Sequence, residues 1–584
     1  MNAETRKCEN CKQPFVIEPE DFGFYQKMQV PPPTWCPDCR MLRRMIWRNE
    51  RGLYRDKCGL CGKNILSMYS GDRKYPVYCR DCWWSDKWDP LSFGRELDTA
   101  RPFLEQFREL DERVPRMNLW QVNVQNSDFA NFVRDEKEVY LSYSVIQAEN
   151  IYFSKNVDNA FSIFDSLDAH DSENCYQCVK PSKDFNCRYA VYSRSCIDSA
   201  FIYDCVNCTN CFMSSNLRNK EYYFRNQPHT REEYLAKLKE VNQGSWSVLQ
   251  ELTLEFRELM RKSLNKYAQI TTSTATTGND LENCKNVHDS FNGFDMENIR
   301  YSVRCLKGKD SMDITNIGRN TELIYESVSG GAENSNLLAF ASNSFGGMTD
   351  GWYTDYCHSS SHLFGCVGLR NKQYCILNKQ YTKEEYEALV PRVIEHMNNM
   401  PYTDQQGRIY KYGEFFPPEF SPFAYNETIA QEYFPLAKAE ALERGYRWKE
   451  PDAKDYAATR KPEDLPDHIK DVKDDILQET VGCAHAAPPA GGCNHQCTVA
   501  FKIIPKELEF YRRSTLPLPR LCPNCRHYER LAQRNPLRLW HRQCMCDKAG
   551  HAHSGPCQNE FETSYAPERP EIVYCEACYN AEVV

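Results

Sequence analysis

The sequence predicts a mixed, mainly β fold in which cysteine-rich ribbons at both termini flank a duplicated parallel β-solenoid, β-helix-like, with helical caps. Three observations support this prediction. Residues 217–234 (LRNKEYYFRNQPHTREEY) recur at residues 369–386 as LRNKQYCILNKQYTKEEY; short β-branched and aromatic runs alternate with Asn, Asp and Ser before each copy; and closely spaced cysteine pairs lie at both ends. Similarity at a fixed offset indicates that one structural unit has been built twice.

The composition is typical of a soluble, folded chain with several domains. The chain has 584 residues, of which 26% are charged and 13% aromatic, and its mean hydropathy is -0.69, which excludes membrane-embedded and disordered classes. The beginning, MNAETRKCENCKQPF, lacks the apolar core of a secretory signal, and no apolar run approaches the ~20 residues of a spanning helix. The 30 cysteines lie largely in short pairs, which suit metal in a reducing compartment better than disulfides. We therefore expect a cytoplasmic protein.

The N-terminal cysteines form C-x-x-C pairs, and two such pairs can close one metal site. Zinc prefers four tetrahedral ligands, and a C-x-x-C turn presents two thiolates to one point. A site with four protein ligands has no open coordination position, so its expected role is structural rather than catalytic. The predicted ligands are Cys8, Cys11, Cys36 and Cys39 for the first site, and Cys58, Cys61, Cys79 and Cys82 for the second.

The C-terminus repeats this design with the same spacings. The 25-residue step from Cys11 to Cys36 recurs between Cys497 and Cys522, and the 18-residue step from Cys61 to Cys79 recurs in the last site. About four structural Zn²⁺ sites are therefore predicted in all. The predicted ligands at this end are Cys493, Cys497, Cys522 and Cys525 for the third site, and Cys557, Cys575 and Cys578 with either Cys544 or Cys546 for the fourth.

The fourth site is preceded by the segment HRQCMCDKAGHAHSGPC, which also offers histidines. Gapless alignment to Cys58 favours Cys544 as the fourth ligand, whereas proximity to the turn favours Cys546. His541, His551 and His553 are interpreted as residues of an insertion loop rather than as ligands, although imidazole is a common zinc ligand.

A basic segment follows the second cysteine pair of the first and third sites. Its arginines recur at helical spacing and so share one helix face. Such a stripe is compatible with a phosphate-binding, nucleic-acid-facing surface. With a formal net charge of -9, the alternative is pairing with acidic segments of the same chain, of which residues 463–479 (EDLPDHIKDVKDDILQE) are one. The stripe residues are Arg40, Arg44 and Arg48 at one end and Arg526, Arg530 and Arg534 at the other.

The middle of the chain is predicted to stack coils of about 20 residues. Cysteines step by nine from Cys178 to Cys205 and again from Cys357 to Cys375, and a fixed step is typical of coils that bury one another. Small, apolar Cys suits an inward stack. The alternative of further metal at CVNCTNC (residues 205–211) is disfavoured, because the second copy has Ser360 and Leu363 at the corresponding later positions.

The repeated stretch ends each solenoid and begins a helix. Thr230 with Glu233, and Thr382 with Glu385, fit capping boxes, so each solenoid edge is expected to be covered by a helix. The predicted organisation is residues 1–90 tandem zinc ribbons, 91–229 first β-solenoid module, 230–279 helical cap, hairpin and polar linker (the linker at 271–280), 280–381 second β-solenoid module, 382–480 cap helix and Pro/aromatic connector, and 481–584 tandem zinc ribbons.

The ribbon segments CPNCRHYERLAQRNPLRLWHR and NEFETSYAPERPEIVYCEACY, with the connector GEFFPPEFSPFAYNET, resemble an uncharacterised group of zinc-ribbon hypothetical proteins from small, reduced-genome uncultivated bacteria. The resemblance extends over nearly the whole chain. It implies a bacterial, cytoplasmic protein with zinc ribbons at both ends, and it assigns no catalytic residue.

Two classes of function are compatible with these features. The first is a non-enzymatic interaction protein that docks to nucleic acid or a ribonucleoprotein through Arg-lined zinc ribbons, or that serves as a protein scaffold, with no membrane partner and an undetermined oligomeric state. The alternative is an enzyme of the polysaccharide lyase or hydrolase type, because two carboxylates on a solenoid face can act as acid and base. The phosphate-loop, H-E-x-x-H and G-x-S-x-G motifs are missing. The enzyme candidates are Asp165, Asp168, His170 and Asp171.

Overall fold

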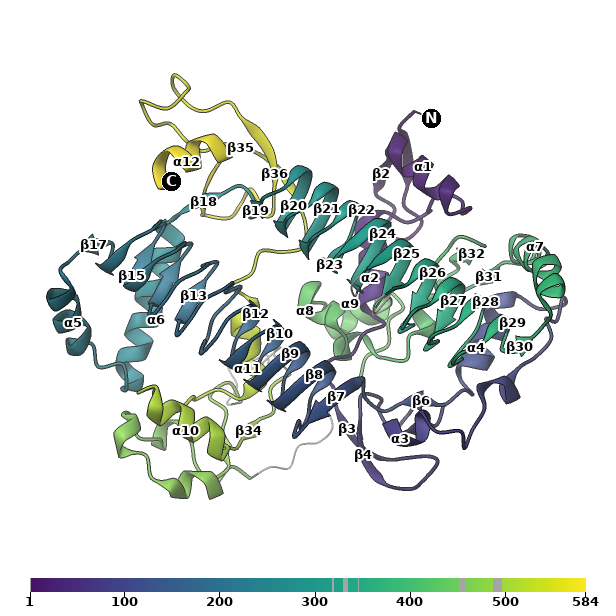
Figure 1. The fold of residues 1–584 in the computed structure, drawn as a ribbon, viewed down its shortest axis with the longest axis horizontal. Coiled ribbons are helices and arrows are strands. Elements are labelled where there is room, and N and C mark those ends of the chain that lie inside the picture. The colour runs from purple at the N-terminus through teal and green to yellow at the C-terminus, as the bar shows by residue number, and fades with distance from the viewer. Residues whose placement is uncertain (1, 318–319, 329–333, 345, 451–456, 487–495) are drawn as a thin grey trace.

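The computed structural model describes all residues except 1, 318–319, 329–333, 345, 451–456 and 487–495. It is mainly β, with shorter helices and a cluster of cysteines near each end of the chain (Figure 1). Two stacks of parallel strands form its body, and the cysteine-containing modules surround them.

The first stack spans residues 121–228, and neighbouring strands pair in parallel except for the last. Paired residues lie 12 positions apart, as for Val133 and Val145. Isolated parallel bridges with the same step continue the ladder between β12 and β13. The strands are β7 (Gln121–Gln125), β8 (Asn131–Tyr140), β9 (Tyr143–Tyr152), β10 (Lys155–Asp158), β11 (Phe161–Phe164), β12 (Leu167–His170), β13 (Arg188–Val191), β14 (Ala200–Tyr203), β15 (Thr209–Ser215), β16 (Glu221–Phe224) and the antiparallel β17 (Gln227–Pro228).

The second stack repeats this arrangement over residues 270–380. Its ladders also step by 12 residues near β22, but the step reaches 14 between Glu322 and Asn336. The predicted polar linker at 271–280 is wrong, because Thr-rich β-branched sequence forms strand there. The strands are β19 (Ile270–Thr271), β20 (Thr274–Glu282), β21 (Lys285–Phe294), β22 (Glu297–Arg300), β23 (Val303–Cys305), β24 (Gly308–Ile317), β25 (Thr321–Val328), β26 (Asn336–Ser342), β27 (Thr349–Asp355), β28 (Ser361–Phe364), β29 (Gln373–Ile376) and β30 (Lys379–Gln380).

The path of each turn follows from a backbone repeat. Every third residue from Asn123 to Arg225 has a positive φ, so a 12-residue turn has four corners. Asn and Asp tolerate this left-handed conformation best, and many corners carry them. Their side chains join successive turns: Asn159 Nδ2 donates to Asp171 at 2.6 Å, and Asn186 Nδ2 donates to Asp198 at 2.6 Å. The Asn/Asp-rich sequence is therefore the corner chemistry of a repeating turn.

The residue after each corner points inward and builds the core of the stack. Val133, Val145 and Val157 form one such column and are fully buried. Cysteines occupy the same inward positions, and most of their thiols in the first stack donate to a carbonyl oxygen nine residues later, as Cys178 Sγ does to Cys187 at 3.5 Å. Because a turn has 12 residues and four sides, a step of nine residues leads to a side adjacent to the starting one. These cysteines are buried in the core of the stack, as sequence analysis predicted.

Helices cover the ends of both stacks, as the repeated stretch predicts. Helices α5 (Arg231–Glu240) and α7 (Lys383–Asn399) begin with capping boxes: Thr230 Oγ1 accepts the Glu233 N–H at 3.2 Å, and Thr382 does the same for Glu385. Helix α6 (Trp246–Lys262) buries its apolar stripe against the first stack, where Phe256 meets Phe201 at 5.7 Å between ring centroids.

The cysteine modules cross over between the stacks. The module that contains Cys8 packs on the second stack, and the module that contains Cys522 packs on the first (Figure 1). The last module contacts both: it lies against β20 of the second stack, and Arg218 of the first stack donates to its Tyr579 hydroxyl at 2.6 Å. The N-terminal elements are β1 (Glu4–Lys7), β2 (Pro14–Ile17), α1 (Pro19–Lys27), α2 (Pro37–Met45), β3 (Tyr54–Lys57), β4 (Asn64–Ser67), β5 (Val77–Tyr78), α3 (Arg80–Trp83), α4 (Phe103–Asp111) and β6 (Arg116–Met117).

The C-terminal modules make the reciprocal contacts. Strand β18 (Leu264–Lys266), which follows α6, pairs in parallel with β37 near the end of the chain. The elements of this half are β33 (Val481–Gly482), β34 (Ala500–Phe501), α10 (Pro505–Arg513), α11 (Pro523–Leu531), β35 (Trp540–Gln543), β36 (Glu560–Thr563), β37 (Ile572–Tyr574) and α12 (Glu576–Val583).

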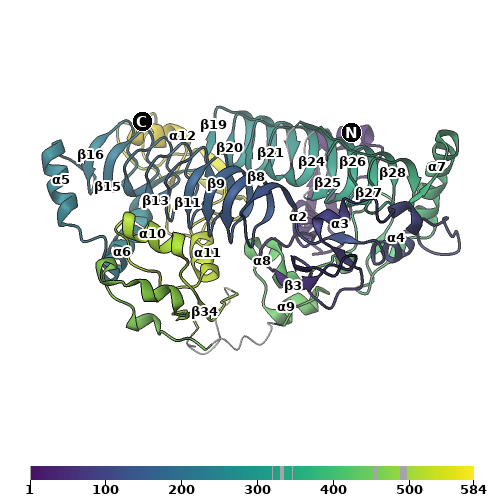
Figure 2. The same cartoon turned by 60° about the horizontal axis from the view of Figure 1, so that its bottom comes forward.

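The two stacks also contact each other directly. They lie side by side over part of their lengths (Figures 1 and 2). Lys180 of the first stack reaches Asp280 and donates to Asn292 Oδ1 at 2.6 Å, and Arg194 pairs with Glu282 at 2.7 Å. The aromatic connector, with β31 (Tyr402–Thr403), β32 (Ile409–Tyr410), α8 (Ile429–Tyr433) and α9 (Lys438–Glu443), packs between the N-terminal module and the second stack.

The same buried ion-pair motif fixes a module to each stack. Arg40 and Arg44 of α2 both bind Asp313, at 2.9 and 3.0 Å. Arg526 and Arg530 of α11 both bind Asp165, at 2.6 and 3.0 Å. Both aspartates are corner residues with positive φ and are fully buried.

Removing either aspartate should destabilise the fold, because two buried guanidinium groups would lose their shared partner. We expect Asp313→Ala and Asp165→Ala each to lower the free energy of unfolding by about 3–5 kcal/mol. Denaturant-unfolding midpoints measure this. Asp198→Ala is the matched control, since Asp198 is also a corner residue but is exposed, and it should cost less than about 1 kcal/mol. Equal midpoints for D313A and D198A would contradict this account.

Candidate metal centres

Four groups of four cysteines converge in the structure. Within each group the sulfur atoms lie within 4.8 Å of one another, and almost all of these cysteines are buried. Two groups lie in the N-terminal modules and two in the C-terminal modules. The groups are Cys8, Cys11, Cys36 and Cys39; Cys58, Cys61, Cys79 and Cys82; Cys483, Cys497, Cys522 and Cys525; and Cys544, Cys557, Cys575 and Cys578.

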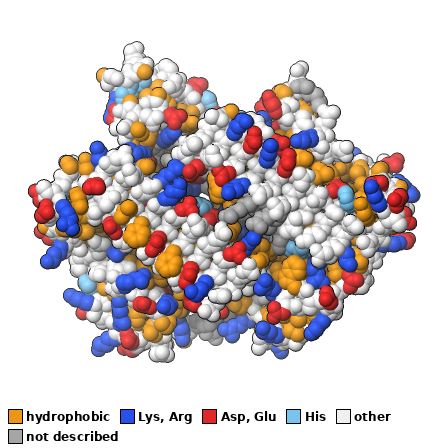
Figure 3. Space-filling model, in the orientation of Figure 1, with side chains coloured by type: hydrophobic (Ala, Val, Ile, Leu, Met, Phe, Trp, Pro, Cys, Tyr) orange, Lys and Arg blue, Asp and Glu red, His pale blue; other side chains and the backbone are white. Residues whose placement is uncertain are grey.

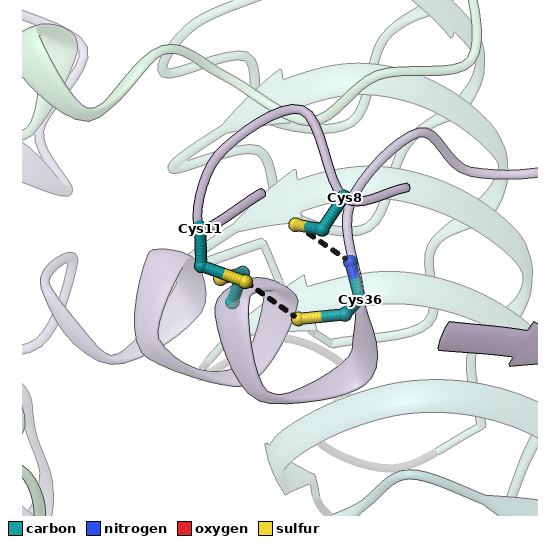
Figure 4. Close-up of side chains that lie close together, drawn as sticks. Cys8, Cys11 and Cys36 are labelled. Carbon is teal, nitrogen blue, oxygen red and sulfur yellow. Dashed lines mark hydrogen bonds between the residues drawn. The ribbon is translucent and has the colours of Figure 1, made fainter. Parts of the chain in front are cut away.

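All four groups share one backbone design. The first two cysteines lie between two antiparallel strands, and the third cysteine is the N-cap of a helix. The N–H of the third cysteine donates to the sulfur of the first, which Figure 4 shows for Cys36 and Cys8. The same bond recurs at 3.1–3.2 Å in every group: Cys36 to Cys8, Cys79 to Cys58, Cys522 to Cys483 and Cys575 to Cys544.

The second cysteine pair of each group lies at the start of a helix. The C-x-x-C spacing alone had suggested a second turn like that of the first pair. Cys36, Cys79, Cys522 and Cys575 are the N-caps of α2, α3, α11 and α12. Free N–H groups at a helix start favour negative charge, so this position stabilises thiolates.

Hydrogen bonds favour the thiolate form of one cysteine in each of two groups, Cys58 and Cys575. Burial opposes ionisation of Cys58, but N–H groups of Cys79, Cys61 and Leu60 outweigh it and lower the Cys58 pKa to about 6. Burial likewise opposes ionisation of Cys575, but the Asn559 amide and the Cys578 N–H lower its pKa to about 7. The Asn559 amide donates to Cys575 Sγ at 3.4 Å, and Asn10 donates to Cys39 Sγ at 3.2 Å.

This donor set fits zinc. Four thiolates in a compact group match the tetrahedral preference of Zn²⁺, and a group that is complete within the protein has no position for substrate. The four sites can therefore hold metal as structural centres, in agreement with the predicted number of sites.

The third group contains a ligand that sequence analysis did not predict. Cys483 joins Cys497, Cys522 and Cys525, which gives four sulfurs without Cys493. Cys493 lies outside the described residues. Strand β33 pairs with β34, and the Cys483 N–H donates to the Val499 carbonyl at 2.8 Å, which places its sulfur at the site. The equivalent bond in the first group joins the Cys8 N–H to the Gln13 carbonyl. A search for a cysteine that directly follows a short strand, in place of a search for two closely spaced cysteines, could therefore have identified Cys483.

The fourth group resolves the choice between two cysteines. Cys544 is the ligand that corresponds to Cys58, as gapless alignment indicated. Cys546 instead lies beside His551 and His553, and these three residues form a further group with Cys578. Both histidines lie in the loop inserted before Cys557, as interpreted, but their ring nitrogens also lie close enough to the sulfurs to form a possible metal-ligand group. His541 is exposed and hydrogen-bonds to Glu560 and Glu562.

The arginine stripes lie inside the molecule. Arg40, Arg44, Arg526 and Arg530 bind the buried aspartates described above. Arg48 is 4% exposed and binds Glu50 at 2.5 Å, and Arg534 stacks over the Tyr433 ring at 4.4 Å. The predicted phosphate-binding face is therefore not formed by these side chains. Their described carboxylate partners include Asp313 and Asp165 of the strand stacks, with Glu50 for Arg48 and Glu507 for Arg526, and none of these lies within residues 463–479.

The four enzyme candidates are spread over structural roles. Asp165 is bound by two arginines. Asp168 accepts from Asn156 at 2.6 Å; burial opposes its ionisation, but Lys180 and Arg534 lower its pKa. His170 Nδ1 lies 3.2 Å from Asp158 Oδ2. Asp171 is an exposed corner residue that accepts a hydrogen bond from Asn159 of the previous turn. These contacts hold turns together and modules in place.

A groove on the first stack contains a buried acid that sequence analysis missed. The groove has a volume of about 790 Å³ and crosses turns between Asn123 and Glu173. Glu136 occupies an inward position there and is 4% exposed. Burial raises the pKa of Glu136 to about 8, although the Ser127 hydroxyl opposes this. Only the 12-residue register, which the sequence did not reveal, identifies this glutamate as inward-facing.

No protein-family model matches this chain, and no curated protein matches it. Among the residues that the structure describes, no helix combines the length and apolar character needed to cross a membrane.

Zinc stoichiometry should distinguish the two cysteines proposed for the third site. We expect the purified protein to contain at least about four zinc ions and Cys483→Ser to lose about one, because its thiolate completes the group. Cys493→Ser should lose none. Metal content by mass spectrometry, normalised to protein, measures this. Loss of zinc in C493S but not in C483S would overturn the assignment.

The buried Glu136 should make stability fall with rising pH. Its folded-state pKa is raised, so the folded chain keeps a proton that the unfolded chain releases, and stability is lost as pH rises toward 8. Glu136→Gln should therefore gain stability relative to the parent, by on the order of 2 kcal/mol between pH 6 and 8. Unfolding midpoints across pH measure this. Glu149→Gln, at an accessible position, is the control, and a parallel pH dependence in parent and E136Q would contradict the burial argument.

Proposed function

We propose that this chain is a zinc-binding, non-enzymatic interaction protein, in which the zinc modules clamp two β-solenoids into one extended docking surface for a protein partner. The observation that carries the proposal is the set of four complete cysteine groups, two of which begin the helices α2 and α11, whose buried arginines enter the strand stacks. Metal held this way stabilises shape and offers no open coordination position for chemistry.

The β-solenoid assignment is supported by the register of the stacks. Parallel partners 12 residues apart and a corner at every third residue make each turn cover the previous one. Stacked turns of this kind bury a continuous core and present long, regular outer faces. The repeat is shorter than the coil of about 20 residues that sequence analysis suggested.

A protein partner is favoured over nucleic acid by the charges and apolar side chains. The arginines of the two stripes contact groups inside the molecule and do not form a basic surface. Acidic and basic side chains are intermingled over the face in Figure 3. The first stack exposes Phe161, Phe185 and Ile197 in one column, each about two-fifths exposed. Phe161 also lines the groove, so this face combines apolar anchors with a hollow.

An enzymatic function has weaker support. The candidate carboxylates are engaged by arginine, asparagine or histidine side chains. The next carboxylate in the inward column of Glu136 is Asp184, four turns further along the stack, so the two do not form an adjacent acid–base pair. A cytoplasmic location is part of the proposal, because no disulfide joins any described cysteine and thiolate sites require a reducing compartment.

The apolar column gives a direct test of the proposal. We expect the triple variant F161S/F185S/I197S to lose its principal co-purifying protein by more than tenfold, because its apolar anchors are gone. Affinity purification from the native cell with quantitative mass spectrometry measures this, with and without nuclease.

The control for this experiment is K285S/E297S/K309S, which changes an outward column of the second stack. Retention of the partner by the control and insensitivity to nuclease are both expected. Co-purification of nucleic acid, with loss of the partner after nuclease, would contradict protein docking in favour of a ribonucleoprotein.

A further inference from the structure

The C-terminal module contains a second group of ligand atoms beside its four cysteines. Cys546 Sγ, His551, His553 and Cys578 Sγ bring their ligand atoms within 4.8 Å of one another. Cys578 belongs to both groups. Two sulfurs and two imidazoles are the donor set of many tetrahedral zinc sites.

An insertion supplies three of these four residues. In the N-terminal counterpart a C-x-x-C turn joins Cys58 to Cys61, whereas residues 545–556 separate Cys544 from Cys557. The Cys557 N–H donates to the Cys546 carbonyl at 2.8 Å and closes the base of this loop. The loop folds back over the last helix, so its histidines reach the Cys578 side of the module.

The hydrogen bonds of His551 leave a lone pair aimed at sulfur. Its Nε2 lies 3.0 Å from Glu582 Oε1, and Lys548 binds the same carboxylate. A carboxylate accepts, so Nε2 carries the hydrogen, and the unprotonated Nδ1 faces Cys546 Sγ at 3.2 Å. A carboxylate behind an imidazole is the usual outer support of a metal-bound histidine.

His553 is oriented in the same way by the backbone. Its Nδ1 lies 2.8 Å from the Gly555 carbonyl, which can only accept, so Nδ1 carries the hydrogen. Its Nε2 lone pair faces Cys578 Sγ at 3.3 Å. Two imidazole lone pairs and two sulfurs therefore converge on one point, where a cation would satisfy all four.

We propose that Cys546, His551, His553 and Cys578 bind an additional divalent metal, zinc by donor chemistry, and that the Cys578 thiolate bridges it to the metal of the Cys544 group. The C-terminal module then holds a binuclear cluster and the chain about five zinc ions. This inference rests on the proposed zinc-binding function. A second cation also lowers the net negative charge of the cluster, which stabilises closely packed thiolates.

Metal counting on the full chain tests the proposal. We expect about five zinc ions in the parent and about four in H551A/H553A, measured by elemental mass spectrometry and by native mass spectrometry. His541→Ala is the matched control, because this exposed histidine of the same module lies outside the group, and it should keep about five.

Cobalt substitution gives a second readout that needs no variant. A thiolate bridge couples two Co²⁺ spins, so the fully cobalt-loaded parent should show a weaker electron paramagnetic resonance signal per cobalt than protein loaded with one equivalent. About four zinc ions in parent and H551A/H553A alike, with no spin coupling, would overturn the bridge but leave the four-site proposal standing. Fewer than three zinc ions in the parent would overturn both.

Discussion

The structure depends on one contact that it makes twice: two arginines of a helix that begins at a cysteine group bind a single buried aspartate of a strand stack. Arg40 and Arg44 meet Asp313, and Arg526 and Arg530 meet Asp165. Charges taken out of water are tolerated only when they are paired in good geometry. The helix must therefore be placed accurately. Its N-cap, Cys36 in α2 and Cys522 in α11, belongs to a cysteine group, and this group fixes the position of the helix.

The chain crosses over because the helix near its N-terminus packs on the second stack, whereas the helix near its C-terminus packs on the first. The first cysteine module docks on the second stack through α2, and the third docks on the first stack through α11. Neither stack is complete without a segment distant in sequence, so the molecule should fold as one unit although it is built from repeats. The aromatic connector reinforces this arrangement, since Phe416 packs on Trp47 and stacks on Phe107 with ring centroids 4.7 Å apart.

The sequence predicted local features well. The cysteine pairs, the duplicated stretch and the Thr–Glu capping boxes all depend on residues close together in the chain, and the structure has each of them. Cys483 was missed because it lies 14 positions before Cys497. Pairing of β33 with β34, and not a short spacing in the sequence, brings its sulfur to the site.

The features that the sequence did not predict depend on register and long-range packing. The 12-residue turn was obscured because cysteines recur every nine residues across its corners. The arginine stripes were recognised as one helix face, but a stripe facing a buried aspartate and a stripe facing solvent have the same sequence pattern. Only the position of Asp165 and Asp313 in the stacks distinguishes them.

The central claim is that metal at the Cys8 group holds α2 and thereby the second stack. Hydrogen–deuterium exchange of α2 and β24, recorded before and after zinc is chelated, tests it most directly. This account predicts that both elements lose protection together, because the Arg40–Asp313 and Arg44–Asp313 contacts require the helix in place. Unchanged protection of β24 after α2 has become exchangeable would contradict it.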